Sequence, residues 1–243
     1  MSAQASMNRP LPSLDYGVGV GVGLLLAGLI GFALARIGSV PLKADIYGEL
    51  GQVSAEDVYA TASPFLAAGF FQIDVEALEL RLEALPWVRE AQVQRLWPDR
   101  LAVRVLSHQP WARWGEHAVL SAEGVLISPP EQPDLALRIE APERMAAEVF
   151  TDLTGILERL PADWRLVYWQ VSSTGDRQAR LEVNGRVIAL EFGREPVAEK
   201  LKLLADVVLP VLKPRWSELA AVDLRYRNGF AVRWLDGSKE NAQ

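Results

Sequence analysis

The stretch LPWVREAQVQRLWPDRL, residues 85–101, decides the fold of the N-terminal half of the chain, and it holds two tryptophans that each neighbour a proline. Pro86 predicts the end of a helix, because proline cannot donate the next helical hydrogen bond. Ala91 and Val93 alternate with polar residues as in a half-buried strand, and Pro98-Asp99 supplies residues typical of a turn. The residues after the turn alternate in the same way, so the stretch predicts a helix end followed by a β-hairpin.

Two helices and a strand are predicted upstream of this hairpin. Apolar residues at helical spacing over 75–85, with Asp74 at an N-cap position, predict the second helix. Ser54, followed three residues later by Asp57, is typical of a capping box and predicts the start of the first helix. A short strand is predicted at 42–47. The order is then β-α-α-β-β over about 70 residues, an ordinary size for a small domain.

This order, with Leu-Pro-Trp-Val at 85–88 and Arg-x-Trp-Pro-Asp-x-Leu at 95–101, resembles the POTRA domain of the FtsQ/DivIB family of bacterial cell-division proteins. Further stretches are similar to other signatures of that family, in the family's order: 110–114, 122–124 and 222–226. The resemblance covers about four-fifths of the chain, far more than one short motif. It implies an α+β protein with a single N-terminal transmembrane helix, a POTRA domain over 40–109 and a mixed β-rich domain with two main helices over 110–236.

The composition is that of a globular protein with more than one compact unit. The chain has 243 residues, half of them hydrophobic, and a net charge of -6. This acidic balance argues against a nucleic-acid partner. The chain has no cysteine, which excludes a disulfide framework, a thiolate nucleophile and a cysteine metal site.

Residues 17–35 form an uncharged run rich in Leu, Val, Gly and Ala. Its length is close to the roughly 20 residues that a bilayer-spanning helix needs, and it is longer than the apolar core of a cleaved signal peptide. We therefore expect an uncleaved transmembrane helix over 16–36, after a short tail at 1–15. Basic residues flank the run on both sides, so charge does not decide the orientation. The resemblance implies a cytoplasmic tail, periplasmic C-terminal domains, and a single-pass inner-membrane protein at the division septum.

Small residues recur four apart within this run, as Gly17 and Gly21 do. Such spacing lets a second transmembrane helix approach closely. The run is therefore either a contact for homodimerisation or a plain lipid-facing anchor.

Beyond Pro110, short apolar runs separated by Gly, Pro, Asn and Asp predict a β-rich domain with two amphipathic helices. One helix is expected from about Pro142 to Pro161 and the other from about Pro196. Asn184-Gly185 is typical of a two-residue hairpin loop. Strands are predicted around 119, 125–127, 135–139, 166–171, 179–183, 187–192, 221–226 and 230–235. The end of the chain, 237–243, is expected to be a flexible tail.

The last hairpin can be given a register. A two-residue loop at 228–229 would mix charged and apolar side chains on one face of the hairpin. A three-residue loop at 227–229 gives one apolar face, with Gly229 free to adopt the left-handed conformation. We therefore predict the three-residue loop, with Tyr226 opposite Phe230, Leu224 opposite Val232 and Val222 opposite Trp234.

The sequence does not favour catalysis. It has two histidines, His108 and His117, and it lacks the His-Glu-x-x-His and Gly-x-Ser-x-Gly motifs. We expect both histidines at the surface, and no catalytic site, metal site or cofactor. An enzyme using carboxylates such as Asp99, Glu116 and Glu123 is a weaker alternative, because no spacing favours it.

The final strand is the candidate binding site. No strand follows it in the sequence to cover it, and a free edge accepts an added strand. The resemblance implies that this region docks FtsB, one member of the FtsB/FtsL pair, through an added strand and helix. The corresponding positions are Arg225, Tyr226, Asn228, Gly229, Phe230, Val232 and Trp234. The alternative for Tyr226 and Trp234 is that they only pack the sheet.

The resemblance also implies recruitment to the division site through FtsK, by the part of the POTRA domain around Val93, Arg95 and Trp97, and a link to the septal synthase components FtsW and FtsI. From the residues alone, Trp87 and Trp97 are either partner anchors or core residues. A core position is favoured, because a tryptophan beside a helix-stopping proline often fills a core.

A rival function is a POTRA-type transport or chaperone module, in which the same fold captures substrate strands. Such proteins carry tandem POTRA copies and a barrel, and this sequence has neither pattern.

Overall fold

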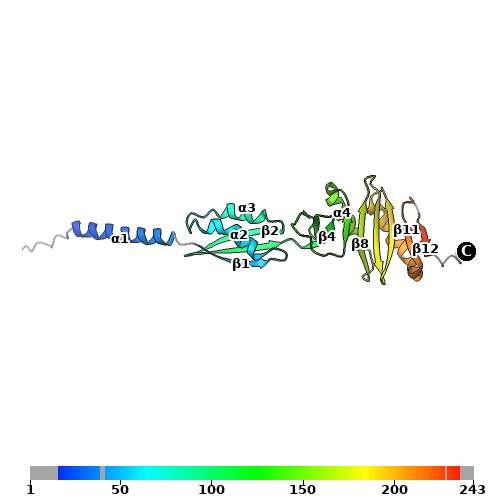
Figure 1. Cartoon of the computed structure of the whole chain (residues 1–243), viewed down its shortest axis with the longest axis horizontal. Helices are drawn as coiled ribbons and strands as arrows, with labels where there is room; N and C mark the ends of the chain where they lie inside the picture. The colour runs from blue at the N-terminus through cyan, green and yellow to red at the C-terminus, as the bar shows by residue number, and fades with distance from the viewer. Residues whose placement is uncertain (1–15, 39–41, 228, 236–243) are drawn as a thin grey trace, which may run out of the picture. The chain divides into compact units, whose positions relative to one another are not determined.

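The computed structural model describes residues 16–38, 42–227 and 229–235 (Figure 1). Helix α1 spans Tyr16–Gly38. Within the described residues, no helix meets the length and apolarity needed to cross a bilayer, so the transmembrane helix predicted over 16–36 is not confirmed. The predicted tails at 1–15 and 237–243 lie outside the described residues.

Contacts divide the chain into two compact units. The first is built chiefly from Ser54–Leu82 and Ala91–Val105, and the second chiefly from the chain after Leu106. Each unit is described by itself below.

The first unit has the predicted β-α-α-β-β order. Its elements are β1 (Lys43–Glu49), α2 (Ala55–Leu66), α3 (Val75–Glu83), β2 (Val88–Leu96) and β3 (Arg100–Ser107). The strands form a sheet in the order β1-β3-β2, and the two helices lie over one face of it (Figure 1). Fully buried side chains from both layers fill the space between them: Val58, Leu78, Leu82, Leu101, Val103 and Val105.

Both predicted helix caps are present. The Ser54 hydroxyl accepts a hydrogen bond from the backbone N–H of Glu56 at the start of α2. The Asp74 carboxylate accepts one from the backbone N–H of Ala77, at 3.0 Å, at the start of α3. These side chains satisfy N–H groups that have no partner inside the helix.

The two tryptophans of the 85–101 stretch have opposite environments. Trp87 is buried, as predicted, whereas Trp97 is 69% exposed. The prediction of a core position for Trp97 is therefore wrong. Trp97 follows the last residue of β2 within the turn, and a turn at the end of a hairpin projects from the domain, so its side chain has few neighbours to pack on.

The second unit is a nine-stranded sheet with helices packed on it. The strand order is β12-β11-β10-β9-β8-β7-β4-β5-β6. The strands are β4 (Pro110–Trp114), β5 (Ala118–Ser121), β6 (Leu126–Ile127), β7 (Arg138–Glu140), β8 (Trp164–Val171), β9 (Arg177–Val183), β10 (Arg186–Gly193), β11 (Leu219–Asp223) and β12 (Ala231–Trp234). Strand β4 is an element that the sequence did not predict.

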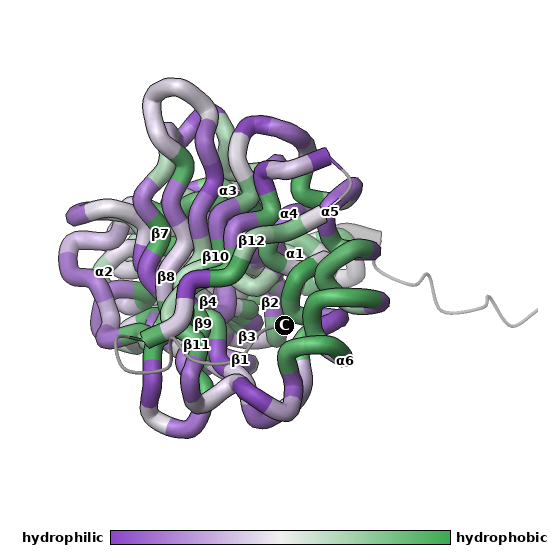
Figure 2. Tube along the Cα trace, turned by 90° about the vertical axis from the view of Figure 1, so that its right-hand side faces the viewer, coloured by the Kyte–Doolittle hydropathy of each residue, from purple (hydrophilic) through white to green (hydrophobic). Residues whose placement is uncertain are grey.

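The helices of this unit fall into two groups. The first group is η1 (Glu143–Met145) and α4 (Ala146–Leu157), and the second runs through α5 (Val197–Leu203), η2 (Leu204–Val208), α6 (Leu209–Leu212) and η3 (Lys213–Glu218). Figure 2 shows the hydrophobic character of the segment that leads into α6. Their apolar residues join one core with those of α4 and the sheet, including Leu153, Trp169, Phe192, Leu201 and Val208.

The hairpin predicted at Asn184-Gly185 is confirmed. Val183 of β9 pairs with Arg186 of β10, which leaves two residues in the loop. Both have positive φ, 51° for Asn184 and 76° for Gly185. This is the conformation that a two-residue loop needs to match the twist of its strands.

The register predicted for the last hairpin is wrong. Val222 pairs with Val232 and Asp223 with Ala231, so the loop is 224–230 and not 227–229. The backbone N–H of Leu224 donates to the carbonyl of Glu191 on β10, at 2.8 Å, which draws the chain away from β12. The shift is an even number of residues, so the predicted apolar face is kept although the predicted pairs are not.

Candidate functional site

Strand β12 is an end strand of the nine-stranded sheet, as the sequence predicted. The N–H of Leu235 donates to the carbonyl of Glu218, at 2.8 Å, on the side of β11. Backbone groups alternate in direction along a strand, so the N–H of Arg233 also faces β11. Those of Val232 and Trp234 face the outer side, where no strand is paired in the described part of the chain.

The loop before β12 is held by ion pairs. The Arg225 guanidinium lies 2.6 Å from the Asp223 carboxylate and 3.3 Å from that of Glu191 on β10. The hydrogen bond from Arg225 holds the pKa of Asp223 below its ordinary value, so this carboxylate stays ionised well into the acid range. Tyr226 follows with a side chain that is 57% exposed. The loop therefore presents a fixed guanidinium and a free phenol ring next to the open strand.

A small hollow of about 220 Å³ lies beside this edge. It is lined by Glu191, Ala221, Asp223, Arg225, Ala231, Val232 and Arg233. The lining residues come from β10, β11, the loop and β12, so the hollow lies over a face of the sheet and carries charged side chains of both signs.

Lys200 of α5 contacts the loop before β12. It was not identified as a site residue from the sequence. Its side chain is buried, at 3% exposure. The ammonium donates to the backbone carbonyl of Tyr226 at 2.9 Å and lies 2.8 Å from the carboxylate of Glu195. The hydrogen bond from Lys200 lowers the pKa of Glu195. Its position, three residues after Val197 and four before Leu204 on the apolar stripe of the helix, is the signal that could have marked it.

Trp234 and Tyr226 were each predicted either to contact a partner or to pack the sheet, and the structure places them differently. Trp234 is half-buried and packs against the core. The guanidinium of Arg215 also lies 4.2 Å from its ring centroid. Phe230 and Val232 likewise pack partly on the core, while Tyr226 points into solvent. Gly229 is partly buried, and Asn228 lies outside the described residues.

The three candidate residues of the POTRA domain are not equally accessible. Val93 is buried, and its N–H donates to the Glu79 carboxylate at 2.6 Å. Arg95 donates to the carbonyl of Ile73, also at 2.6 Å. Only Trp97 offers a large exposed apolar surface. The side chain of Val93 is thus a core contact, and Arg95 and Trp97 are the parts of this region open to a partner.

The two histidines differ from each other. His117 is exposed beside Glu116, as predicted. His108 is largely buried and lies 3.1 Å from the carboxylate of Glu123, which also pairs with Arg89, so the prediction of a surface position for His108 is wrong. Within the described residues, no group of histidine, aspartate and glutamate side chains could hold a metal ion.

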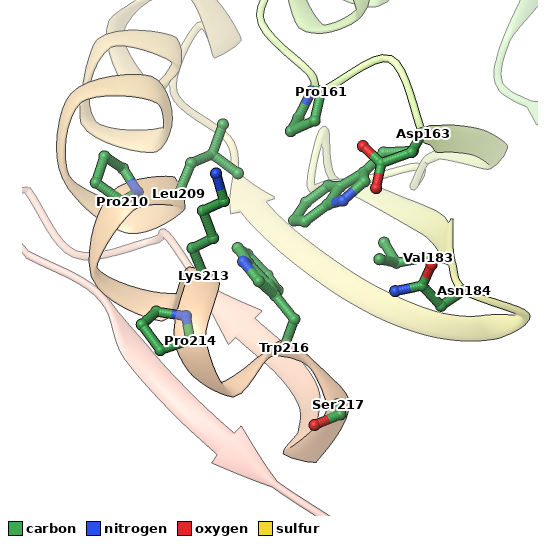
Figure 3. A pocket seen from close by; sticks show the side chains of 11 residues that line it. Pro161, Asp163, Val183, Asn184, Leu209, Pro210, Lys213, Pro214, Trp216 and Ser217 are labelled. Atoms are coloured by element: carbon green, nitrogen blue, oxygen red, sulfur yellow. The ribbon is translucent and has the colours of Figure 1, made fainter.

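A cavity lies between the α6–η3 segment and the ends of β8 and β9 (Figure 3). Its volume is about 700 Å³. Trp164 and Trp216 meet edge to face on one side, with ring centroids 4.2 Å apart. Asp163 and Lys213 are the charged residues in its lining. The other lining residues are apolar or uncharged.

Two family models match the chain in sequence order. A POTRA domain of the FtsQ type matches residues 45–107, and the C-terminal domain of the cell division protein FtsQ/DivIB matches 112–225. Strand β12 lies beyond the second match.

Proteins named "Cell division protein FtsQ" match over most of their length. The one from Xanthomonas campestris is 32% identical over 198 residues, or 77% of this chain and 67% of its own. Those from Shewanella oneidensis and Nitrosospira multiformis are 31% and 33% identical, over 82% and 76% of this chain and 76% and 78% of their own. The β-α-α-β-β unit and the β-rich unit thus coincide with the two domains of one family, and the chain belongs to the FtsQ/DivIB family of cell division proteins.

Proposed function

We propose that this chain is a non-catalytic scaffold of the division machinery that docks FtsB, and with it FtsL, along strand β12. The observation that carries the proposal is the open outer side of β12 in the described part of the sheet. A partner strand added there would pair with the N–H groups of Val232 and Trp234. In this mode of recognition, main-chain hydrogen bonds provide affinity and neighbouring side chains provide specificity.

The side chains beside the strand fit such a role. Tyr226 is exposed, and Arg225 is held in place by Asp223 and Glu191. Tyrosine and arginine are among the residue types that dominate interface energetics. The exposed guanidiniums of Arg225 and Arg233 would suit carboxylates on the partner and would fix its register.

The proposal is tested by co-purification of FtsB with two variants at one position. Val232→Pro removes an N–H that faces the outer side of β12, and edge strands tolerate proline at such positions. Because Val232 packs partly on the core, we expect this variant to lose some stability but to remain folded, and to lose FtsB. Val232→Thr keeps the N–H and should retain FtsB. A folded Val232→Pro protein that still captures FtsB would overturn the docking edge.

The scaffold would also connect other division proteins. We assign recruitment through FtsK to the POTRA region around Arg95, whose side chain is exposed, and a downstream link to FtsW and FtsI to the complex with FtsB and FtsL. Homodimerisation through small residues such as Gly21 would be a further property of the N-terminal helix.

The scaffold is proposed to be anchored in the inner membrane by residues 16–36, with both C-terminal domains in the periplasm. The uncharged run 17–35 supports this. Long domains are translocated with little regard to the charges that flank the anchor.

A further inference from the structure

Trp97 is distinctive among the tryptophans of this chain. All eight lie within the described residues, and the other seven are buried or half-buried, whereas Trp97 is 69% exposed. A large aromatic ring exposed at a turn contributes nothing to the core. A tryptophan side chain combines an apolar body with a polar N–H, which suits a site that is apolar at one end and wet at the other.

Three hydrogen bonds define the end of the POTRA domain at which Trp97 lies. The N–H of Lys43 at the start of β1 donates to the carbonyl of Asp99 in the hairpin turn, at 2.9 Å, and the N–H of Leu42 donates to the carbonyl of Leu66 at the end of α2, at 3.1 Å. Arg95 on β2 donates to the carbonyl of Ile73 in the α2–α3 loop. The hairpin turn, the α2–α3 loop and the entry of the chain into the domain are therefore neighbours at one end (Figure 1).

A second exposed aromatic ring belongs to the same end. Phe71 lies in the α2–α3 loop and is 58% exposed. It meets the buried ring of Phe70 edge to face, with centroids 5.3 Å apart. The side chains of Lys43 and Arg95 are also exposed at this end. Long basic side chains can lie along an apolar surface while their charged groups stay in water.

The chain itself limits how far this end can be from α1. Helix α1 ends at Gly38, and Leu42 already belongs to the folded domain. The four intervening steps span at most about 14 Å when fully extended. If α1 is anchored in a bilayer, Leu42 lies within this distance of α1, and the turn that carries Trp97 adjoins Leu42 through the bond between Lys43 and Asp99.

We propose that Trp97 and Phe71 insert into the interfacial layer of the bilayer that holds α1. This inference rests on the proposed membrane anchor. Tryptophan is enriched at the level of the lipid headgroups, and aromatic residues flanked by basic ones are typical of segments that lie in this layer. The contact would fix the POTRA domain against the membrane surface, so that α1 and the hairpin turn together set its orientation.

Quenching of tryptophan fluorescence by brominated lipid tests the contact. The full chain is reconstituted into phosphatidylcholine vesicles whose acyl chains are brominated near the headgroups, and into unbrominated vesicles as a reference. Helix α1 contains no tryptophan, so quenching reports on the folded domains. We expect Trp97→Ser to lose most of the quenching and Trp234→Phe, a matched loss of another tryptophan, to retain it. Adding Phe71→Trp to the Trp97→Ser variant should restore quenching.

Other outcomes separate this inference from the anchor on which it rests. If the chain resists carbonate extraction from the vesicles but Trp97→Ser leaves the quenching unchanged, the lipid contact is overturned and the anchor stands. If carbonate removes the chain, the anchor fails and the lipid contact with it. If the wild type is not quenched and Trp97→Ser abolishes recruitment to the septum in cells, Trp97 contacts a protein and not a lipid.

Discussion

Arg177 on β9 illustrates how a single residue can couple two elements of the β-rich domain. Its guanidinium is buried, at 6% exposure. It lies 3.2 Å from the Asp152 carboxylate, also pairs with Glu148, and donates to the carbonyl of Arg194 at 3.0 Å. A buried charge is tolerated only when it is paired and hydrogen-bonded. Both carboxylates come from α4, so this one side chain ties the helix to the sheet.

The pKa of Asp152 leads to a prediction about stability. Burial raises this pKa from an ordinary 3.8 to about 6, against the attraction of Arg177. The folded state then holds a proton that the unfolded state has released, so this group stabilises the fold below about 4 and loses that contribution as the pH rises to about 6. Compared with Asp152→Asn, which resembles the protonated form, the wild type should lose stability over this range.

Urea unfolding of both proteins between these pH values measures the effect. Glu158→Gln, at an exposed position just after α4, is the control and should follow the wild type. A stability difference between wild type and Asp152→Asn that is the same at both ends of the range would mean that Asp152 has no raised pKa.

Two aromatic residues of β12 and its loop have different roles: one packs on the core and the other is available to a partner. Trp234 packs on the core and under Arg215, so Trp234→Ala should lower the free energy of unfolding by about 1–3 kcal/mol. Tyr226 is exposed, and Tyr226→Ala should change it by less than about 0.5 kcal/mol while still weakening capture of FtsB. Thermal unfolding and co-purification of both variants check this. Equal losses of stability would contradict the assignment of Tyr226 to the partner surface.

The elements that the sequence predicted well are those fixed by local chemistry. Asp74 and Ser54 cap helices through their own nearest neighbours, and Asn184-Gly185 fixes its hairpin through its own φ angles. The register of the last hairpin depends instead on Glu191, which lies far away in the sequence. Its backbone carbonyl accepts a hydrogen bond from the N–H of Leu224. The alternation of apolar and polar residues along a strand shows which face of the sheet each side chain occupies. It does not show which residue of the neighbouring strand lies opposite.

In the candidate site, too, features fixed by neighbouring residues could be predicted, whereas contacts between distant parts of the sequence could not. The open edge could be predicted from the sequence, because no strand pattern follows β12 in the described part of the chain. Lys200 could not be assigned to the loop, because its contact with Tyr226 joins elements that are distant in the sequence. The exposure of Trp97 could have been predicted, because Pro98-Asp99 marks a turn directly beside it. The burial of His108 could not, because its partner Glu123 lies 15 residues away in the sequence.

At the scale of the whole molecule, chain order reflects the proposed division of labour. In the described part of the chain, the POTRA domain follows the uncharged run within a few residues of α1, and the proposed docking edge lies on β12. A scaffold that joins a membrane-bound partner to others needs its attachment and docking surfaces on separate parts of the chain.

Because the sequence has no cysteine, its fold needs no disulfide and does not depend on the redox state of the compartment.

This arrangement predicts the membrane topology. A reporter enzyme that is active only in the periplasm, fused after Leu235, should be active in cells, because the anchor over 16–36 would carry both domains across the inner membrane. The same fusion lacking residues 16–36 should be inactive, since nothing else in the proposal directs the chain across the membrane. An inactive full-length fusion, with the fused protein intact in the cell, would place the POTRA domain and β12 in the cytoplasm. The β12 edge would then be separated from periplasmic partners, and both the anchor and the docking proposal would have to be abandoned.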